Sequence, residues 1–230
     1  MTTIADNIAQ VRSRIHAAEH AAQRAADSVQ LLAVSKTKPA QALREAYAAG
    51  LRDFGENYLQ EALGKQAELT DLPLIWHFIG PIQSNKTRAI AEHFDWVHSV
   101  DRLKIAQRLS EQRPAELPPL NICIQVNVSG EASKSGCTPT DLPALAKAIA
   151  ALPHLTLRGL MAIPEPTDDR AEQDAAFAAV QRLQASLDLP LDTLSMGMSH
   201  DLESAIAQGA TWVRIGTALF GARDYGQTPS

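Results

Sequence analysis

The chain has 230 residues, of which 45% are hydrophobic and 20% are charged, and its formal net charge is −5. This length suits one large domain or two small ones, and the apolar fraction is enough to build a buried core. The mild acidity, with no long block of like charge, argues against a nucleic-acid-binding surface, which needs concentrated basic residues.

Two cysteines, Cys123 and Cys137, are fewer than the disulfide framework of a secreted protein usually needs. Neither has neighbours at metal-ligand spacing, so we expect no zinc site. The N-terminal segment lacks the apolar core of a signal peptide, and no apolar run is long enough to cross a bilayer. We therefore expect a cytoplasmic protein.

The first predicted element is an amphipathic helix within residues 1–25. Its apolar residues recur every three or four positions, which is the spacing of one helical face: Ile4, Ile8, Val11, Ile15 and Ala18. Because this helix precedes every predicted strand, it is an addition to the repeat that follows.

Short apolar runs then alternate with helical stretches rich in Ala and Leu. The predicted strands are Leu31–Ser35, Leu51–Phe54, Leu74–Ile79, Trp96–Val100, Ile122–Val128, Thr156–Ile163, Thr193–Met196 and Trp212–Ile215. The predicted helices between them are Pro39–Ala49, Tyr58–Leu69, Asn85–His93, Asp101–Gln112, Thr140–Leu152, Asp169–Leu187 and His200–Gln208. We expect residues 226–230 to form a frayed tail.

Eight alternating units favour a single-domain, closed (β/α)8 barrel, because strand–helix alternation implies parallel strands joined by crossover helices. The rival is an open doubly wound sheet, which usually has fewer strands and a glycine-rich turn after the first one. Here the first strand runs into Ser-Lys-Thr-Lys-Pro (residues 35–39), without glycine. No linker or shift in composition marks a second domain.

The active site of such a barrel lies at the carboxyl ends of its strands. The polar residues expected there include Lys36, Asn57, His77, Ser199, Arg214, Gly216 and Thr217. Loops after the seventh and eighth strands often bind phosphate. Ser199 stands where an N-cap would begin the next helix, and Gly216-Thr217 offers an uncovered backbone and a hydroxyl. These residues fit a phosphate site and an ordinary helix cap with turn equally well.

Lys36 follows an apolar strand and shares a face with Val34. A lysine in the mouth of a barrel is partly desolvated, which lowers the pKa of its amine and makes it a usable nucleophile toward an aldehyde. Most lysines are simply solvated, and Lys38 fits that description. Lys36 opposite a phosphate site predicts a phosphorylated aldehyde as ligand, with pyridoxal 5′-phosphate (PLP) as the obvious candidate.

Arg214 lies two residues before Gly216 and so shares its face of the strand. Beside the pyridine nitrogen of PLP, a guanidinium could only donate and would keep that nitrogen unprotonated, which weakens the ring as an electron sink. The alternative is a structural arginine that pairs with a carboxylate such as Asp53 or Glu203.

Several long motifs in this order resemble the pyridoxal phosphate homeostasis protein family, whose barrel is like the N-terminal domain of alanine racemase. They cover nearly the whole chain: AVSKTKP (Ala33–Pro39), FGENYLQEA (Phe54–Ala62), WHFIGPIQSNK (Trp76–Lys86), VNVSGEASKSG (Val126–Gly136), RGLMAIP (Arg158–Pro164), SMGMSHDLESAI (Ser195–Ile206) and VRIGTALFGARDY (Val213–Tyr225).

The resemblance implies that Lys36 carries PLP as an internal aldimine, a Schiff base. It implies that Ser199, Gly216 and Thr217 hold the phosphate, that Asn57 and Arg214 lie beside the ring, and that His77 lies in the pocket wall. It further associates Lys134 with a secondary role in handling PLP.

A racemase needs an acid/base group on each face of the substrate, and the second is usually a tyrosine supplied by a partner subunit. The three tyrosines are Tyr47, Tyr58 and Tyr225, and none is obviously aimed at the cofactor. We therefore expect a monomeric PLP carrier that supplies apo-enzymes without conventional turnover. Two alternatives stay open: a PLP-dependent racemase or lyase, and a barrel enzyme whose Lys36 forms a Schiff base with a sugar phosphate.

Overall fold

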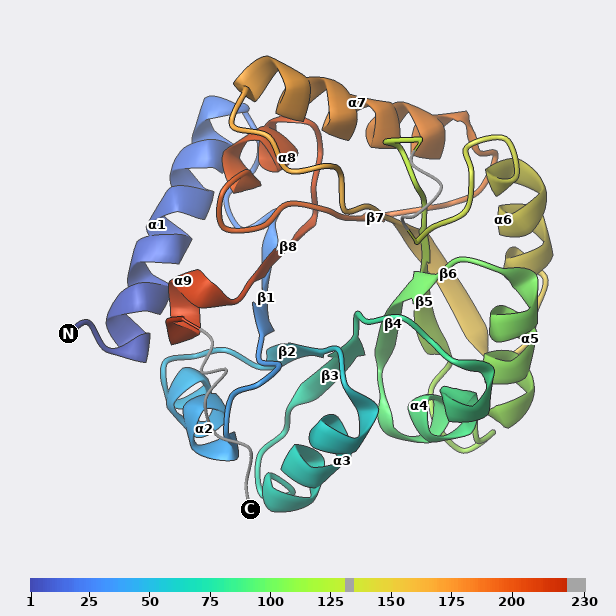
Figure 1. The fold of residues 1–230 in the computed structure, drawn as a ribbon, viewed down its shortest axis with the longest axis horizontal. Coiled ribbons are helices and arrows are strands. Elements are labelled where there is room, and N and C mark those ends of the chain that lie inside the picture. Colours follow the sequence, from blue (N-terminus) through green and yellow to red (C-terminus); the bar gives the residue numbers. More distant parts are fainter. Residues whose placement is uncertain (131–134, 223–230) are drawn as a thin grey trace.

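Eight parallel strands form a closed barrel in the computed structural model, which describes residues 1–130 and 135–222. Neighbours follow chain order, and β8 pairs with β1 to close the ring (Figure 1). The strands are β1 (Gln30–Val34), β2 (Asp53–Glu56), β3 (Ile75–Phe78), β4 (Trp96–Val100), β5 (Leu120–Gln125), β6 (Leu155–Met161), β7 (Thr193–Ser195) and β8 (Trp212–Ile215). The prediction of a closed barrel over an open sheet is confirmed.

Helices surround the strands and connect most of them (Figure 1). They are α1 (Ile4–Ala21), α2 (Ala40–Ala48), α3 (Leu59–Glu68), α4 (Thr87–His93), α5 (Leu103–Gln112), α6 (Leu142–Ala150), α7 (Arg170–Ser186), α8 (Leu202–Ala207) and α9 (Thr217–Phe220). A short 3-10 turn, Ser84–Lys86, leads into α4. The sequence patterns did not predict α9, which is only four residues long.

Helix α1 lies where a longer helix after β8 would lie, beside α8, α9 and α2 (Figure 1). A capping box begins it, because Asp6 N–H donates to the Thr3 hydroxyl and Thr3 N–H donates to the Asp6 carboxylate. Its buried stripe includes Ile8, Val11 and Ile15, so the predicted N-terminal helix is confirmed. Neither α1 nor any other helix within the described residues is long and apolar enough to cross a bilayer.

The second strand begins later than predicted, at Asp53 instead of Leu51. Gly50 has a φ of 101° and ends α2, since the Leu51 N–H donates to the Ala46 carbonyl oxygen at 3.0 Å in a helix-terminating turn. Leu51 is therefore buried in the end of that helix rather than in the sheet. Sequence alone does not separate the two roles, because both need an apolar residue.

The interior of the barrel is partly polar. An apolar cluster fills part of it, formed by Leu32, Trp96, Cys123, Met161 and Trp212. The polar side chains buried on the strands include His77, His98, Ser195 and Arg214. Barrels of this type are usually filled by branched apolar residues. The polar interior therefore marks a departure from simple packing, and it lies next to the predicted site.

Candidate functional site

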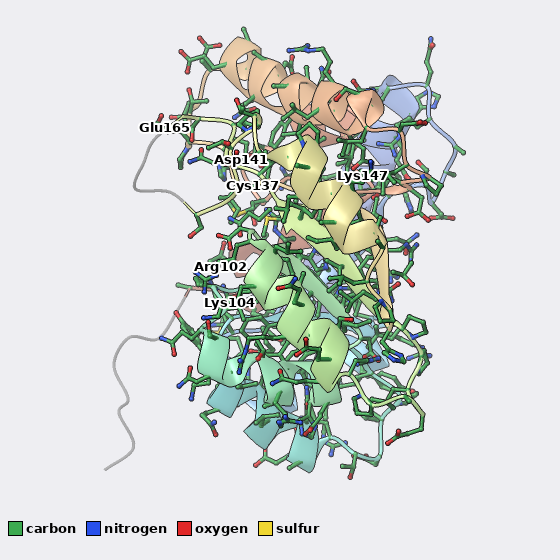
Figure 2. The ribbon with its side chains drawn as sticks, turned by 90° about the vertical axis from the view of Figure 1, so that its right-hand side faces the viewer. Arg102, Lys104, Cys137, Asp141, Lys147 and Glu165 are labelled. Carbon is green, nitrogen blue, oxygen red and sulfur yellow. The ribbon has the colours of Figure 1, made fainter. Side chains whose placement is uncertain are left out.

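The segments that follow the strands gather on one side of the barrel. Figure 2 shows this for Arg102, Cys137 and Glu165, which come after β4, β5 and β6. Lys147, which belongs to α6, lies further toward the other side.

A pocket opens on this side between the ends of β1, β2, β7 and β8. Its lining is Val34, Lys36, Asn57, Ile79, Ile163, Met198, Ser199, His200, Arg214, Gly216 and Thr217. Six of the seven residues predicted to bind the cofactor are among them, brought together from distant parts of the chain. The seventh, His77, is not.

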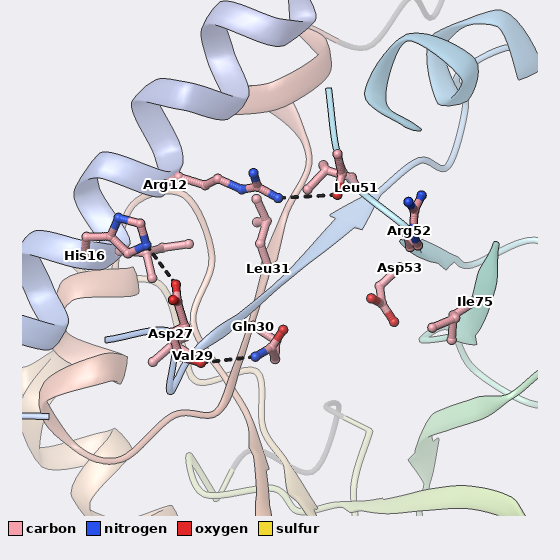
Figure 3. Close-up of a pocket in the computed structure, with 12 residues that line it drawn as sticks. Arg12, His16, Asp27, Val29, Gln30, Leu31, Leu51, Arg52, Asp53 and Ile75 are labelled. Carbon is pink, nitrogen blue, oxygen red and sulfur yellow. Dashed lines mark hydrogen bonds and ion pairs between the residues drawn. The ribbon is translucent and has the colours of Figure 1, made fainter. Parts of the chain in front are cut away.

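A larger cavity of about 520 Å³ lies at the opposite, amino end of the strands. Arg12, Asp27, Arg52 and Asp53 are among the residues around it (Figure 3). Size alone would favour this cavity as the functional site. The polar residues selected by the sequence patterns nevertheless meet in the smaller pocket, where barrel chemistry is normally located.

Lys36 is half-buried, and its backbone is held on both sides. Before it, the Ser35 hydroxyl donates to Glu56 Oε1 at 2.8 Å, and Lys65 Nζ donates to the Ser35 carbonyl oxygen at 2.7 Å. After it, Thr37 has a φ of 66° and its N–H donates to Glu61 Oε1 at 2.5 Å. The loop that carries Lys36 is thus fastened to β2 and α3.

The fastening depends on a buried ion pair between Glu56 and Lys65, whose charged atoms are 2.7 Å apart. Burial raises the pKa of the Glu56 carboxyl, while the nearby Lys65 lowers it. Lys65 also pairs with Glu61, four residues earlier on α3. These residues are not among those that the sequence patterns indicate, although the i,i+4 spacing of Glu61 and Lys65 is typical of an ion pair on a helix.

Arg214 is 4% exposed, and its side chain donates to two acceptors inside the barrel. Nη1 donates to Ser195 Oγ at 2.9 Å and Nη2 donates to the Ala162 carbonyl oxygen at 3.1 Å. Burial lowers the pKa of the guanidinium to about 10, so it is still charged at neutral pH.

The alternative role for Arg214, a structural pair with Asp53 or Glu203, is wrong. Asp53 binds His77 and Glu203 binds Arg14, each at 2.8 Å, and no ion pair joins Arg214 to a carboxylate among the described residues. The pocket wall therefore contains a buried positive charge with no direct counter-charge. Such an arrangement favours an anionic ligand.

Ser199 lines the pocket, but the prediction that it caps the following helix is wrong. Helix α8 starts at Leu202 with Asp201 in the N-cap position. A turn comes first, in which the Met198 N–H donates to Asp201 Oδ1 at 2.7 Å. The Ser199 carbonyl oxygen accepts from Arg14 Nη2 at 2.8 Å, so α1 holds this loop in place.

Gly216 is the N-cap of α9, and Thr217 is its first residue. The Leu219 and Phe220 N–H groups both donate to the Gly216 carbonyl oxygen. The N–H groups of the first helical residues, Thr217 and Ala218, have no acceptor within the helix. Together with the Thr217 hydroxyl they supply the donors that an anion requires.

The backbone of Asn57 packs closely against Gly80. A Cβ added to Gly80 would come within 2.6 Å of the Asn57 carbonyl oxygen, so this close contact depends on the glycine. Its side-chain Oδ1 is buried and accepts no hydrogen bond within the described residues. A buried acceptor without a donor is unfavourable, so a ligand that supplies a donor would be stabilised here. This unpaired atom fits a pocket built for a polar ligand.

His77 lies deeper in the barrel than the pocket wall where the resemblance placed it. It is fully buried, with Nε2 2.8 Å from Asp53 Oδ1 and Nδ1 2.9 Å from His98 Nε2. Its ring stacks on Trp96 with centroids 5.4 Å apart. It turns inward because its β3 neighbours Trp76 and Phe78 point out toward the helices.

Tyrosine is absent from the pocket lining in the part of the chain that is described. Tyr47 lies under the Arg52 guanidinium, 4.6 Å from its ring centroid, and Tyr58 is 52% exposed. Tyr225 and Lys134 lie outside the described residues, as does the predicted tail.

His200 does line the pocket and is a titratable group that the predicted site did not include.

Comparisons with known proteins show which family the chain belongs to. The family model "Alanine racemase, N-terminal domain" matches residues 3–224. A pyridoxal phosphate homeostasis protein of Pseudomonas aeruginosa is 77% identical over 230 residues and covers 100% of both chains. The protein of the same name from Escherichia coli is 55% identical over 235 residues, covering 98% of this chain and 99% of its own.

Solved structures give the same result. PipY of Synechococcus elongatus with PLP bound is 46% identical, with a TM-score of 0.84, and the match covers 95% of this chain and 100% of PipY. Alanine racemase of Corynebacterium glutamicum is 20% identical with a TM-score of 0.68, covering 95% of this chain and 61% of the racemase, and shows the fold alone. The chain therefore belongs to the pyridoxal phosphate homeostasis protein family.

Proposed function

We propose that this protein binds PLP in the pocket lined by Lys36, Asn57, Ser199, Arg214, Gly216 and Thr217, and takes part in PLP homeostasis. The observation that carries the proposal is a primary amine just after β1 that lines the same pocket as anion donors following β7 and β8 and a buried arginine, which has no carboxylate partner among the described residues. The PLP-bound structure of PipY, a relative of 46% identity, supports it.

In this proposal Lys36 holds the cofactor as a Schiff base. Its Nζ attacks the aldehyde carbon, a C=N bond forms, and the carbonyl oxygen leaves as water. PLP supplies the aldehyde and an electron-withdrawing ring. Thr217 and Ser199 bind the phosphate, while Arg214 donates toward the ring side of the pocket and Asn57 supplies an acceptor.

The carrier role follows from what surrounds Lys36. No tyrosine lines the pocket among the described residues, so the pocket lacks the usual second acid/base group of a racemase. We propose that the protein holds PLP and passes it to apo-enzymes by exchange of the Schiff base from Lys36 to an amine of the recipient. Lys134 would serve a secondary role in that handling.

An absorption spectrum with added PLP tests the binding, before and after borohydride reduction, in wild type, Lys36→Ala and Lys38→Ala. Lys38 is the matched control, because it lies two residues away and donates to the Ala222 carbonyl oxygen instead of lining the pocket. We expect a visible band and a label on the Lys36 peptide in wild type and Lys38→Ala only. A sugar phosphate on Lys36 would give no visible band.

His200 favours one second candidate, a racemase or lyase, because its imidazole lines the same pocket as Lys36 and could exchange a proton. Turnover assays across the amino acids with wild type and His200→Ala separate the two functions. A carrier gives no turnover at ordinary enzymatic rates in either protein. Turnover that His200→Ala abolishes would establish the enzyme instead.

A further inference from the structure

A chain of four hydrogen bonds crosses the barrel interior and ends at Arg214. Asp53 Oδ1 lies 2.8 Å from His77 Nε2, and His77 Nδ1 lies 2.9 Å from His98 Nε2. His98 Nδ1 lies 2.8 Å from Ser195 Oγ, which is 2.9 Å from Arg214 Nη1. The five side chains come from five strands, so only the closed barrel brings them together.

The two ends of this hydrogen-bond chain determine where its protons lie. A carboxylate only accepts, so His77 donates its Nε2 proton to Asp53, and Nδ1 of the neutral His77 ring is an acceptor. His98 then donates its Nε2 proton to His77 Nδ1, and its own Nδ1 accepts from the Ser195 hydroxyl. At the other end a guanidinium only donates, so Ser195 Oγ accepts from Arg214.

This assignment gives each of the four bonds one donor and one acceptor, with both imidazoles neutral. Their burial is consistent with it, because desolvation lowers the pKa of His77 and lowers that of His98 further. The rings of Trp96 and Trp212 pack against His77, with centroids 5.4 and 5.0 Å away. The two imidazoles in the middle of the hydrogen-bond chain are thus shielded from solvent, while the two ends of that chain reach two different cavities.

One end is Asp53, whose side chain is 23% exposed in the cavity at the amino end of the strands (Figure 3). The other end is Arg214 in the ligand pocket. Ser195 Oγ and the Ala162 carbonyl oxygen occupy two of the five N–H donors of Arg214, which sets the plane of the guanidinium.

We propose that Ser195, His98, His77 and Asp53 are positioning residues, which fix the orientation of Arg214 for the ligand through this directional chain. This inference rests on the proposed PLP site. If the side chains served only to fill the barrel, apolar residues would do so without the cost of burying polar groups. Their shared direction toward the arginine is what a filling role leaves unexplained.

Three variants test the pocket end: Ser195→Ala, Ser195→Thr and, as matched control, Ser110→Ala. Ser110 is likewise a buried serine. Its hydroxyl donates to the Pro153 carbonyl oxygen, and it lies on α5 outside the pocket. Titration with PLP should show about tenfold weaker binding for Ser195→Ala, because Arg214 loses an acceptor for a charged hydrogen bond. Ser195→Thr should recover most of the affinity, and Ser110→Ala should bind as wild type does.

Asp53→Asn tests the far end without touching the pocket, and Asp27→Asn is its control. Asp27 lines the same cavity and is 84% exposed. An amide can donate or accept, so Asp53→Asn loosens the direction of the chain and should weaken PLP binding by roughly threefold. Asp27→Asn should leave the affinity unchanged.

Nitrogen-15 NMR of the protein without PLP tests the chain independently of the ligand. We expect both His77 and His98 to carry a proton on Nε2 and none on Nδ1 at neutral pH, and this pattern to change in Asp53→Asn. The opposite tautomers, or PLP affinity unchanged in Ser195→Ala and Asp53→Asn, overturn the inference. Failure of wild type to bind PLP overturns the proposed function instead, while the NMR result still reports on the chain.

Discussion

Lys36 and Arg214 show how single residues acquire chemistry from where they lie. Lys36 is half-buried just after β1, and Arg214 is 4% exposed on β8, so an amine and a guanidinium share one pocket. Burial makes the Arg214 charge more dependent on an anionic partner than it would be in water. The pocket therefore suits a phosphorylated ligand better than a neutral one.

Thr217 is expected to recognise the phosphate group alone. Thr217→Val keeps the shape of the side chain and removes its hydroxyl, so PLP should bind about tenfold more weakly or worse. Pyridoxal, which has no phosphate, should bind Thr217→Val and wild type equally. Equilibrium titrations with both compounds measure this, and an equal loss for pyridoxal would contradict the assignment.

His77 and His98 are expected to make the fold less stable in mild acid. Their folded pKa values lie below the ordinary 6.5, so the unfolded chain takes up protons that the folded chain does not. The free energy of unfolding should fall as pH drops below about 6.5, by up to about 1.4 kcal/mol per pH unit for each imidazole.

Urea unfolding at several pH values between about 7.5 and 5 measures this slope. His98→Gln should reduce the slope, whereas His20→Gln, which changes an exposed histidine of α1, should leave it as in wild type. An undiminished slope in His98→Gln would mean that another group is responsible.

At the scale of elements, α3 and β2 support the loop that carries Lys36. Glu56 is 0% exposed and Lys65 6% exposed in their ion pair, and Glu61 holds the Thr37 N–H. A helix outside the barrel thereby controls the position of a residue in its mouth. Helix α1 does the same for the β7 loop, through Arg14 and the Ser199 carbonyl oxygen.

Lys65→Met should destabilise the fold by about 3–5 kcal/mol, because it leaves the buried Glu56 carboxylate without a counter-charge. The loss should shrink at acid pH, where Glu56 can take up a proton. Arg44→Met, which breaks the half-exposed pair with Asp71, is the control and should change stability little. Chemical unfolding of both variants measures the difference, and equal effects would rule out this role for the buried pair.

At the scale of the whole molecule, closure of the barrel creates both the pocket and the polar interior. Strand β8 pairs with β1, which brings Arg214 and Thr217 to Lys36 across the full length of the chain. Helix α1 covers the barrel beside this closure, because α9 is too short to do so.

We expect the protein to be a monomer, since a single-domain barrel with an open pocket needs no second chain to complete its fold. Sedimentation equilibrium should give the mass of a single chain, with and without PLP. A stable dimer, or a partner residue cross-linked near Lys36, would contradict this and would reopen the possibility of a second catalytic group from a neighbour.

Local sequence patterns determine the architecture of this protein. The alternation of apolar runs with helical spacing is enough to predict eight strands and a barrel, since each run reflects a local preference. The motif around Lys36 and the Gly-Thr pair after β8 are enough to predict most of the pocket lining, because a parallel barrel puts the carboxyl ends of all its strands on one side.

Tertiary structure alone decided which partners those residues meet. No local pattern distinguishes Arg214 bound to Ser195 from Arg214 bound to Asp53, because the choice depends on register across several strands. The inward turn of His77, the start of α8 at Leu202 rather than after Ser199, and the buried pair of Glu56 and Lys65 are of the same kind. Contacts between residues far apart in sequence arise only when the barrel closes. These contacts fix the positions of the functional side chains, whereas the sequence alone indicates only which residues they are.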